Sequence, residues 1–258
     1  MIRSRFSLLG VLVVAIGLMA FFASAAQAEG EWLVLKADGK LYSGAEIEAN
    51  AEKFEILELE NKTGALLSEI GTTKIAILCT ALELIDALLN ATGGIKEGAK
   101  VKFTGCKFLA EGPEGLNKEF PKCVPKTNGG PNGTVETLPF HGLLKLHELK
   151  LTGEKHDTLL LLPDDKIEEH VTTLELGAAC AFGEEIPIFG LLSVWSCAKE
   201  PNKEALEHLL SHLITEFEPL TTLSLFALRG KLGAKNAKID GSARVRLFSD
   251  RLWAGSPK

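Results

Sequence analysis

Short stretches in which apolar and polar residues alternate recur along most of the chain. In residues 53–60, Leu57 and Leu59 alternate with two glutamates, and residues 100–104 and 240–248 alternate in the same way. Successive side chains of a strand point to opposite faces of a sheet, so this period of two indicates strands with one buried face. Apolar and β-branched runs predict further strands at residues 31–35, 72–80, 134–138, 143–151, 157–163, 171–180, 186–197 and 221–228.

Two stretches have a helical period instead. In residues 81–89, apolar side chains at every third or fourth position lie opposite Glu83 and Asp86. In residues 204–214, apolar pairs recur every four positions and polar residues fill the other side. These spacings predict a short helix in the first stretch and a clearer helix in the second.

The predicted elements define the fold class. About ten short strands are separated by turn signals, and residues 112–133, rich in proline and glycine, are expected to form a loop. We therefore predict a mainly β protein, a sandwich or partly closed barrel with one or two short helices.

The first 28 residues have the pattern of a secretory signal peptide. Arg3 and Arg5 precede a charge-free apolar core, and Ala26-Gln27-Ala28 forms a small-x-small cleavage site. The apolar core is shorter than the ~20 residues of a membrane-spanning helix. We expect residues 1–28 to be removed and residues 29–258 to form a single β-rich domain without a transmembrane anchor. The predicted location is secreted, in a periplasm or outside the cell.

The charge of the chain bears on its partners. The net charge is −6, and loss of the two signal arginines would make it −8. An acidic protein is poorly suited to bind nucleic acid, so we expect no nucleic-acid partner. The sequence does not identify any other partner. Residues 229–251 are locally basic, which is typical of a solvated strand face, with a small anion or docking patch as the alternative.

The five cysteines predict disulfides if the chain is exported. Cys106 and Cys123 have the same spacing as Cys180 and Cys197, which favours these two pairs and leaves Cys79 as a possible free thiol. The alternative joins Cys79 to Cys180 and leaves Cys197 free. Spacing alone does not decide the connectivity.

Histidines offer weak metal-ligand candidates. His208 and His212 would share one face of the helix expected at residues 204–214. The run lacks the glutamate of a His-Glu-x-x-His motif, so a solvated polar face is the preferred interpretation and no metal is predicted. His141 and His147 are expected to have structural roles in a strand.

Other catalytic patterns are missing from the sequence. It contains no Gly-x-Ser-x-Gly elbow, phosphate loop or dinucleotide fingerprint. Acidic pairs such as Asp164-Asp165 are interpreted as loop charges, and Trp32 and Trp195 as core residues. We therefore predict no catalytic residue, no cofactor and no enzymatic activity.

Several short motifs are spread over most of the chain after the signal pattern. They are Ile77-Leu78-Cys79, Phe103-Thr104-Gly105-Cys106, Pro121-Lys122-Cys123, Leu144-Lys145-Leu146-His147, Cys180, Gly190, Cys197, His212-Leu213-Ile214 and Asp240-Gly241-Ser242-Ala243. Together with a tryptophan near the expected mature start, they resemble a group of uncharacterised bacterial exported proteins. The resemblance implies export, a bacterial source and a disulfide-containing β-rich fold, and it implies no catalytic residue.

These observations lead to a first hypothesis of a non-enzymatic structural or interaction protein of the cell envelope or extracellular space. The leucine-rich stretch at residues 157–163 motivates a second hypothesis, a binding module for an apolar, lipid-like ligand. A secreted hydrolase that uses scattered carboxylates is the third. An apolar cavity would favour the second hypothesis and converging acids in a cleft the third.

Overall fold

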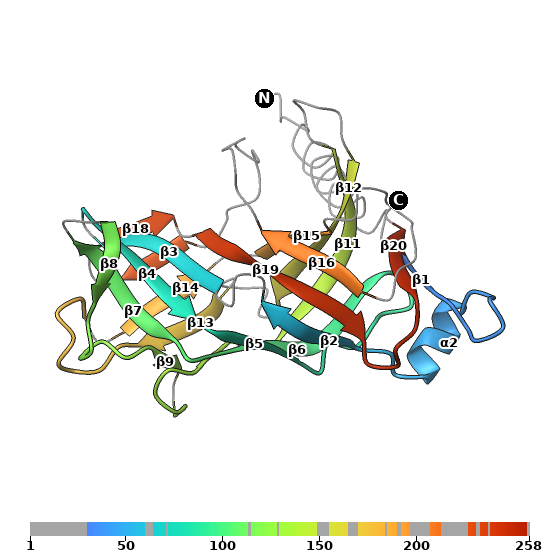
Figure 1. The fold of residues 1–258 in the computed structure, drawn as a ribbon, viewed down its shortest axis with the longest axis horizontal. Helices are drawn as coiled ribbons and strands as arrows, with labels where there is room; N and C mark the ends of the chain where they lie inside the picture. Colours follow the sequence, from blue (N-terminus) through green and yellow to red (C-terminus); the bar gives the residue numbers. More distant parts are fainter. Residues whose placement is uncertain are drawn as a thin grey trace, which may run out of the picture.

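The protein is mainly β, as the sequence predicts (Figure 1). The computed structural model describes residues 30–59, 64–70, 72–112, 115–127, 129–148, 155–164, 170–183, 185–189, 192–196, 207–212, 227–230, 233–236 and 238–256. In this part of the chain, twenty strands form three sheets, and there is one short helix. None of the described sheets closes into a barrel, and their layered arrangement agrees with the sandwich alternative.

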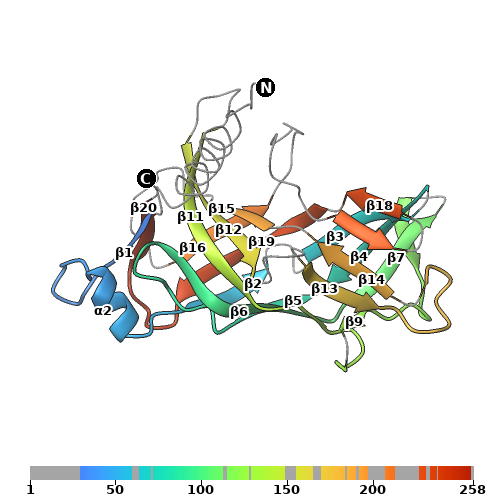
Figure 2. The same cartoon turned by 180° about the vertical axis from the view of Figure 1, so that it is seen from behind.

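The largest sheet has thirteen strands and runs along the length of the molecule (Figures 1 and 2). Its order is β10-β6-β11-β12-β15-β16-β19-β3-β4-β7-β8, with β2 also paired to β19 and β5 to β6. All of its described pairings are antiparallel. The strands are β2 (Phe54–Leu59), β3 (Gly64–Ile70), β4 (Thr73–Cys79), β5 (Ala81–Ile85), β6 (Gly94–Thr104), β7 (Lys107–Gly112), β8 (Gly115–Glu119), β10 (Val135–Glu136), β11 (Phe140–Glu148), β12 (Lys155–Pro163), β15 (Leu192–Ser196), β16 (Glu207–His212) and β19 (Lys238–Leu247).

Two smaller sheets complete the architecture. A five-stranded sheet, in the order β18-β17-β14-β13-β9, packs against the β4–β7 part of the large sheet, and β1 pairs with β20 at the opposite end of the molecule (Figure 2). Their strands are β9 (Lys126–Thr127), β13 (His170–Glu175), β14 (Glu185–Phe189), β17 (Ala227–Gly230), β18 (Gly233–Asn236), β1 (Glu31–Val34) and β20 (Trp253–Ser256).

Two apolar cores lie side by side under the large sheet. The first is built on the aromatic side chains of Trp32, Phe54 and Trp253, which are at most 5% exposed. The second lies between β4 and β7 on one side and β13 and β14 on the other, and it includes both described disulfides. Phe103 of β6 packs against both cores, so this long strand connects them.

The alternation along β19 shows why the sequence pattern identifies this strand. Ala243, Val245 and Leu247 are buried, and the arginines between them face outward. Arg244 pairs with Glu58 at 3.6 Å and Arg246 with Glu55 at 3.0 Å across the β2–β19 ladder. Arg244 and Arg246 of β19 therefore lie on an outward strand face and pair with acids. The basic stretch as a whole is not one strand face, because Arg229 and Lys235 belong to β17 and β18 of the five-stranded sheet.

Both helix predictions are wrong. Residues 81–85 form β5, in which Leu82 and Leu84 pack against the first core. Residues 207–212 form β16, which is held between β15 and β19. In each case sheet partners on the flanking strands decide the conformation, because short apolar runs fit either period.

The expected loop at residues 112–133 and the expected strand at residues 186–197 also need correction. The first contains β8, which pairs with β7, and β9, which pairs with β13. The second is divided into β14 and β15, which belong to different sheets. Of the strand expected at residues 221–228, only the last two residues lie in the described part, in β17.

The described helix, α2 (Gly44–Ala49), has a start signal that hydrophobic periodicity does not reveal. The Ser43 side chain accepts the Glu46 backbone N–H, and the Glu46 carboxylate accepts the Ser43 backbone N–H, which together form a capping box. The Ser-x-x-Glu spacing was a visible signal for this short helix.

The environment of the Glu46 carboxylate should make the stability of the fold depend on pH. Its hydrogen bond with Lys36 (2.6 Å), followed by bonds from Ser43, lowers its pKa from 4.5 to about 2. A lowered folded-state pKa stabilises the fold above pH 4.5, and this contribution is lost as the pH falls toward 2. Between these pH values, wild type should therefore lose stability more steeply than Glu46→Gln in urea unfolding. Parallel curves would contradict the assignment.

The disulfide pairing differs from both sequence-based alternatives. The structure joins Cys79 to Cys106 and Cys123 to Cys180. Cys79 is therefore not a free thiol, and Cys197 lies outside the described residues. Leu78 pairs with Lys107 in the β4–β7 ladder, which places the next residues along, Cys79 and Cys106, 4.0 Å apart at Cα. Strand register therefore decides which cysteines pair, and the equal spacing of the cysteines along the sequence does not.

The expected signal peptide at residues 1–28 lies outside the described residues. In the described ranges, no helix has the length and apolar character needed to cross a membrane.

Candidate functional site

A cavity of about 70 Å³ lies in the second core, between the large sheet and the five-stranded sheet. Every strand that borders it contributes small or branched side chains, so the facing layers leave space between them. The cavity is lined by Gly64, Ala65, Leu66, Ile77, Cys79, Val101, Phe103, Val135, Thr137, Val171, Thr172, Leu174 and Ile188.

The cavity wall is apolar although two threonines belong to it. Thr172 Oγ1 donates to the carbonyl oxygen of Glu136 at 2.7 Å. Thr137 Oγ1 accepts the backbone N–H of Val101 at 2.9 Å. Because both hydroxyls bond to the backbone, no unpaired hydroxyl among the lining residues is left to attract water.

The disulfide between Cys79 and Cys106 fixes one wall of this space. Cys79 ends β4 and lines the cavity, and Cys106 precedes β7 in the same sheet. Both half-cystines are buried at 4% exposure. The covalent link therefore holds the corner between β4 and β7 in place beside the cavity.

A second, smaller cavity of about 30 Å³ adjoins the first. The two share Val101, Thr137 and Val171 as lining residues. The smaller one extends past Phe140 of β11 to Pro163 at the end of β12. Its rim includes Leu138, which is 41% exposed, so the apolar tract reaches from the disulfide toward the surface.

The sequence-based metal candidates are not neighbours in the structure. His208 and His212 lie in strand β16, where four residues span about 13 Å, so they do not share one helical turn. Their side chains lie outside the described residues, as do the side chains of His147 and Trp195. The expectation that Trp32 is a core residue is confirmed by its 5% exposure.

Sequence reasoning did not assemble the lining of the cavity. Its residues come from strands that are far apart along the chain, such as β3, β6 and β14. One partial signal was available, because Val101 and Phe103 alternate with lysines and so identify one wall. The chemistry of this site is apolar contact, since the lining residues offer no acid or base.

Comparisons with known proteins add no identification. No family model, no curated protein and no solved structure matches the chain.

Proposed function

We propose that the protein is an exported, non-enzymatic binding module that holds an aliphatic chain in the apolar tract between its sheets. The observation that carries this proposal is the cavity whose lining offers apolar surface and has its threonine hydroxyls paired to the backbone. Apolar spaces of this kind in proteins take up apolar molecules.

The size of the tract sets the class of ligand. The two adjoining cavities measure about 70 and about 30 Å³. A water-sized sphere takes roughly 10–15 Å³ on this scale, so the larger space holds about five to seven groups of that size and the smaller one about two or three. This is less than the several hundred Å³ of a pocket for a drug-sized molecule. The tract therefore suits a medium-length alkyl chain or the end of a longer one.

The expected affinity follows from the buried apolar groups. Each methylene transferred from water contributes about 0.8 kcal/mol, so about seven carbons contribute between 5 and 6 kcal/mol. Because association also costs translational and rotational freedom, this transfer term is an upper limit, and the dissociation constant should be about 0.1 mM or weaker. A polar head group outside the tract would add to it in the natural ligand.

Titration with 1-octanol, followed by calorimetry, tests the proposal. Wild type should bind with a dissociation constant of about 0.1 mM or weaker. Val171→Phe places a ring where the two cavities meet and should weaken binding at least ~10-fold, because the added ring competes for the space. Val124→Phe is the matched control, since Val124 is also half-buried and lines neither cavity.

The calorimetric result separates the two leading hypotheses. If wild type binds no octanol, or if both variants bind as wild type does, the cavity is a packing space and the structural or interaction role is favoured. Circular dichroism of both variants would establish that the fold is retained.

The location is part of the proposal. Two disulfides are compatible with an oxidising compartment. Together with the signal pattern at residues 1–28, they support a secreted protein of a bacterial periplasm or the extracellular space.

A further inference from the structure

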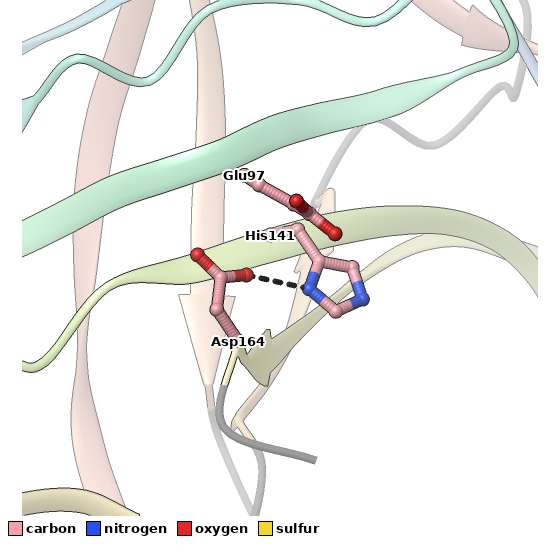
Figure 3. A group of neighbouring side chains, drawn as sticks. All are labelled: Glu97, His141 and Asp164. Carbon is pink, nitrogen blue, oxygen red and sulfur yellow. Dashed lines mark hydrogen bonds and ion pairs between the residues drawn. The ribbon is translucent and has the colours of Figure 1, made fainter.

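Three side chains with metal-binding atoms meet beside the smaller cavity, at the edge of β6, β11 and β12. Glu97, His141 and Asp164 each offer one ligand atom, and these atoms all lie within 4.8 Å of one another. Figure 3 shows the three side chains reaching toward one another from the three segments. The cluster lies outside the lining of both cavities.

A bulge in β6 creates this meeting. Ile95 pairs with Gly142 and Ala99 with Phe140, so three residues of β6 stand opposite His141 alone. Bulges insert extra residues into one strand and re-aim the side chains there. The bulge places Glu97 across from His141.

Hydrogen bonds fix the other two side chains. Asp164 Oδ1 lies 2.8 Å from His141 Nδ1, and Asp164 Oδ2 accepts the backbone N–H of Gly98 at 2.8 Å. The backbone N–H of Asp164 also donates to the Pro139 carbonyl at 3.0 Å. Because the backbone of Gly98 and Pro139 holds Asp164, and Asp164 in turn contacts His141, two of the three donor groups are positioned before any ion arrives.

The charge of the cluster favours a cation. Two carboxylates stand beside one imidazole, and within the described ranges neither carboxylate forms an ion pair with a lysine or arginine. Glu97 is exposed, while His141 and Asp164 are about one-fifth exposed, so an ion can enter from solvent.

We propose that Glu97, His141 and Asp164 form a binding site for a divalent transition metal, with zinc as the ion that fits best. One imidazole nitrogen with two carboxylate oxygens is a donor set that zinc accepts, whereas calcium prefers oxygen atoms alone. The ion takes the place of the proton between Nδ1 and Oδ1. In a tetrahedral site with metal–ligand bonds of about 2.0 Å, two ligand atoms are about 3.3 Å apart. The distance between His141 Nδ1 and Asp164 Oδ1 is 2.8 Å and would need to increase only slightly.

Zinc titration of the chelator-treated full-length protein tests the site by calorimetry. Wild type should bind about one zinc ion per chain through these ligands, and His141→Ala should weaken binding at least ~10-fold, because each ligand of a small site contributes strongly. Glu97→Gln should weaken it too, and this substitution of an exposed side chain keeps the test decisive if His141→Ala does not fold.

Two control proteins separate this site from other zinc-binding groups. Glu111→Gln replaces an exposed glutamate of β7, which pairs with β4 and β8 and with none of the strands of the cluster, and it should bind as wild type does. The double variant His208→Ala with His212→Ala should also keep the affinity. Absence of zinc binding, wild-type affinity in both cluster variants, a loss confined to the His208/His212 variant, or tighter binding of calcium than of zinc would each overturn the proposal.

Discussion

Replacing Trp32 with alanine should lower the free energy of unfolding by about 4 kcal/mol, the middle of the range for a buried tryptophan. Trp32 is 5% exposed, and its ring contacts Phe54 and Trp253 with centroids 5.2 and 5.9 Å away. The substitution removes this packing and leaves a cavity that the surrounding strands fill only in part.

A buried hydrogen bond adds to the effect. Trp32 Nε1 donates to the carbonyl oxygen of Gly94 at 2.7 Å. Gly94 itself lies so close to Gly142 that a Cβ would come within 2.0 Å of that residue's carbonyl oxygen, so the backbone here has little room to adjust. Trp32→Phe removes the donor and keeps an aromatic ring, so its free energy of unfolding should lie between those of wild type and Trp32→Ala.

Urea unfolding followed by circular dichroism measures these differences without relying on tryptophan fluorescence. Leu41→Ala is the control, because Leu41 is 45% exposed and its truncation should change stability by less than ~0.5 kcal/mol. A loss in Trp32→Ala no larger than that in Leu41→Ala would show that the aromatic cluster does not hold β1 and β20 on the core.

The second large effect concerns the disulfides. Replacing Cys123 and Cys180 together with alanine should lower the free energy of unfolding by about 4 kcal/mol, because this link closes a loop with a sequence separation of 57. The Cys79 and Cys106 pair closes a separation of 27, so its removal should cost slightly less, about 3.5 kcal/mol.

The measurement compares the two double variants with wild type in urea, under oxidising and under reducing conditions. Under reducing conditions wild type and both variants should have about the same stability, below that of either variant under oxidising conditions, since both cross-links are then absent from all unfolded chains. Peptide mapping without reduction should join Cys79 to Cys106 and Cys123 to Cys180. A peptide joining Cys106 to Cys123 would contradict the structure.

The sequence predicts the strands best where one face of a sheet is buried and the other is solvated. In β19, the buried Val245 and Leu247 alternate with Arg246, and the period of two is unambiguous. In β16, neighbouring apolar pairs fit a helix equally well, and only the pairing with β15 and β19 selects the strand. Contacts between distant segments therefore decide what local patterns leave open.

The same limit applies to the polar cluster. Asp164 looked like a loop charge and His141 like a structural strand residue. The β11–β12 hairpin pairs Phe140 with Pro163, which brings the following residue, Asp164, next to His141. A hairpin register could have been guessed from the sequence, but the bulge that brings Glu97 to the same place could not, because it depends on the pairing of β6 with β11.

The cavity was beyond sequence reasoning for a related reason. The expected apolar binding stretch at residues 157–163 contributes only Leu161 and Pro163, and only to the smaller space. The main cavity arises where Gly64 and Ala65 of β3 leave space opposite the five-stranded sheet. Volume left between two packed layers depends on how side chains from both layers meet, and this is not a property of any one segment.

The most direct test of the proposed binding function is to locate 1-octanol in the folded protein by nuclear magnetic resonance. With labelled protein and unlabelled octanol, intermolecular nuclear Overhauser effects should connect the alkyl protons to the methyl groups of Ile77, Val135 and Ile188, which line the main cavity. Val171→Phe should abolish these contacts, and Val124→Phe should keep them. Octanol contacts confined to surface methyls such as those of Leu41 and Leu252, or no contacts at all, would contradict the account.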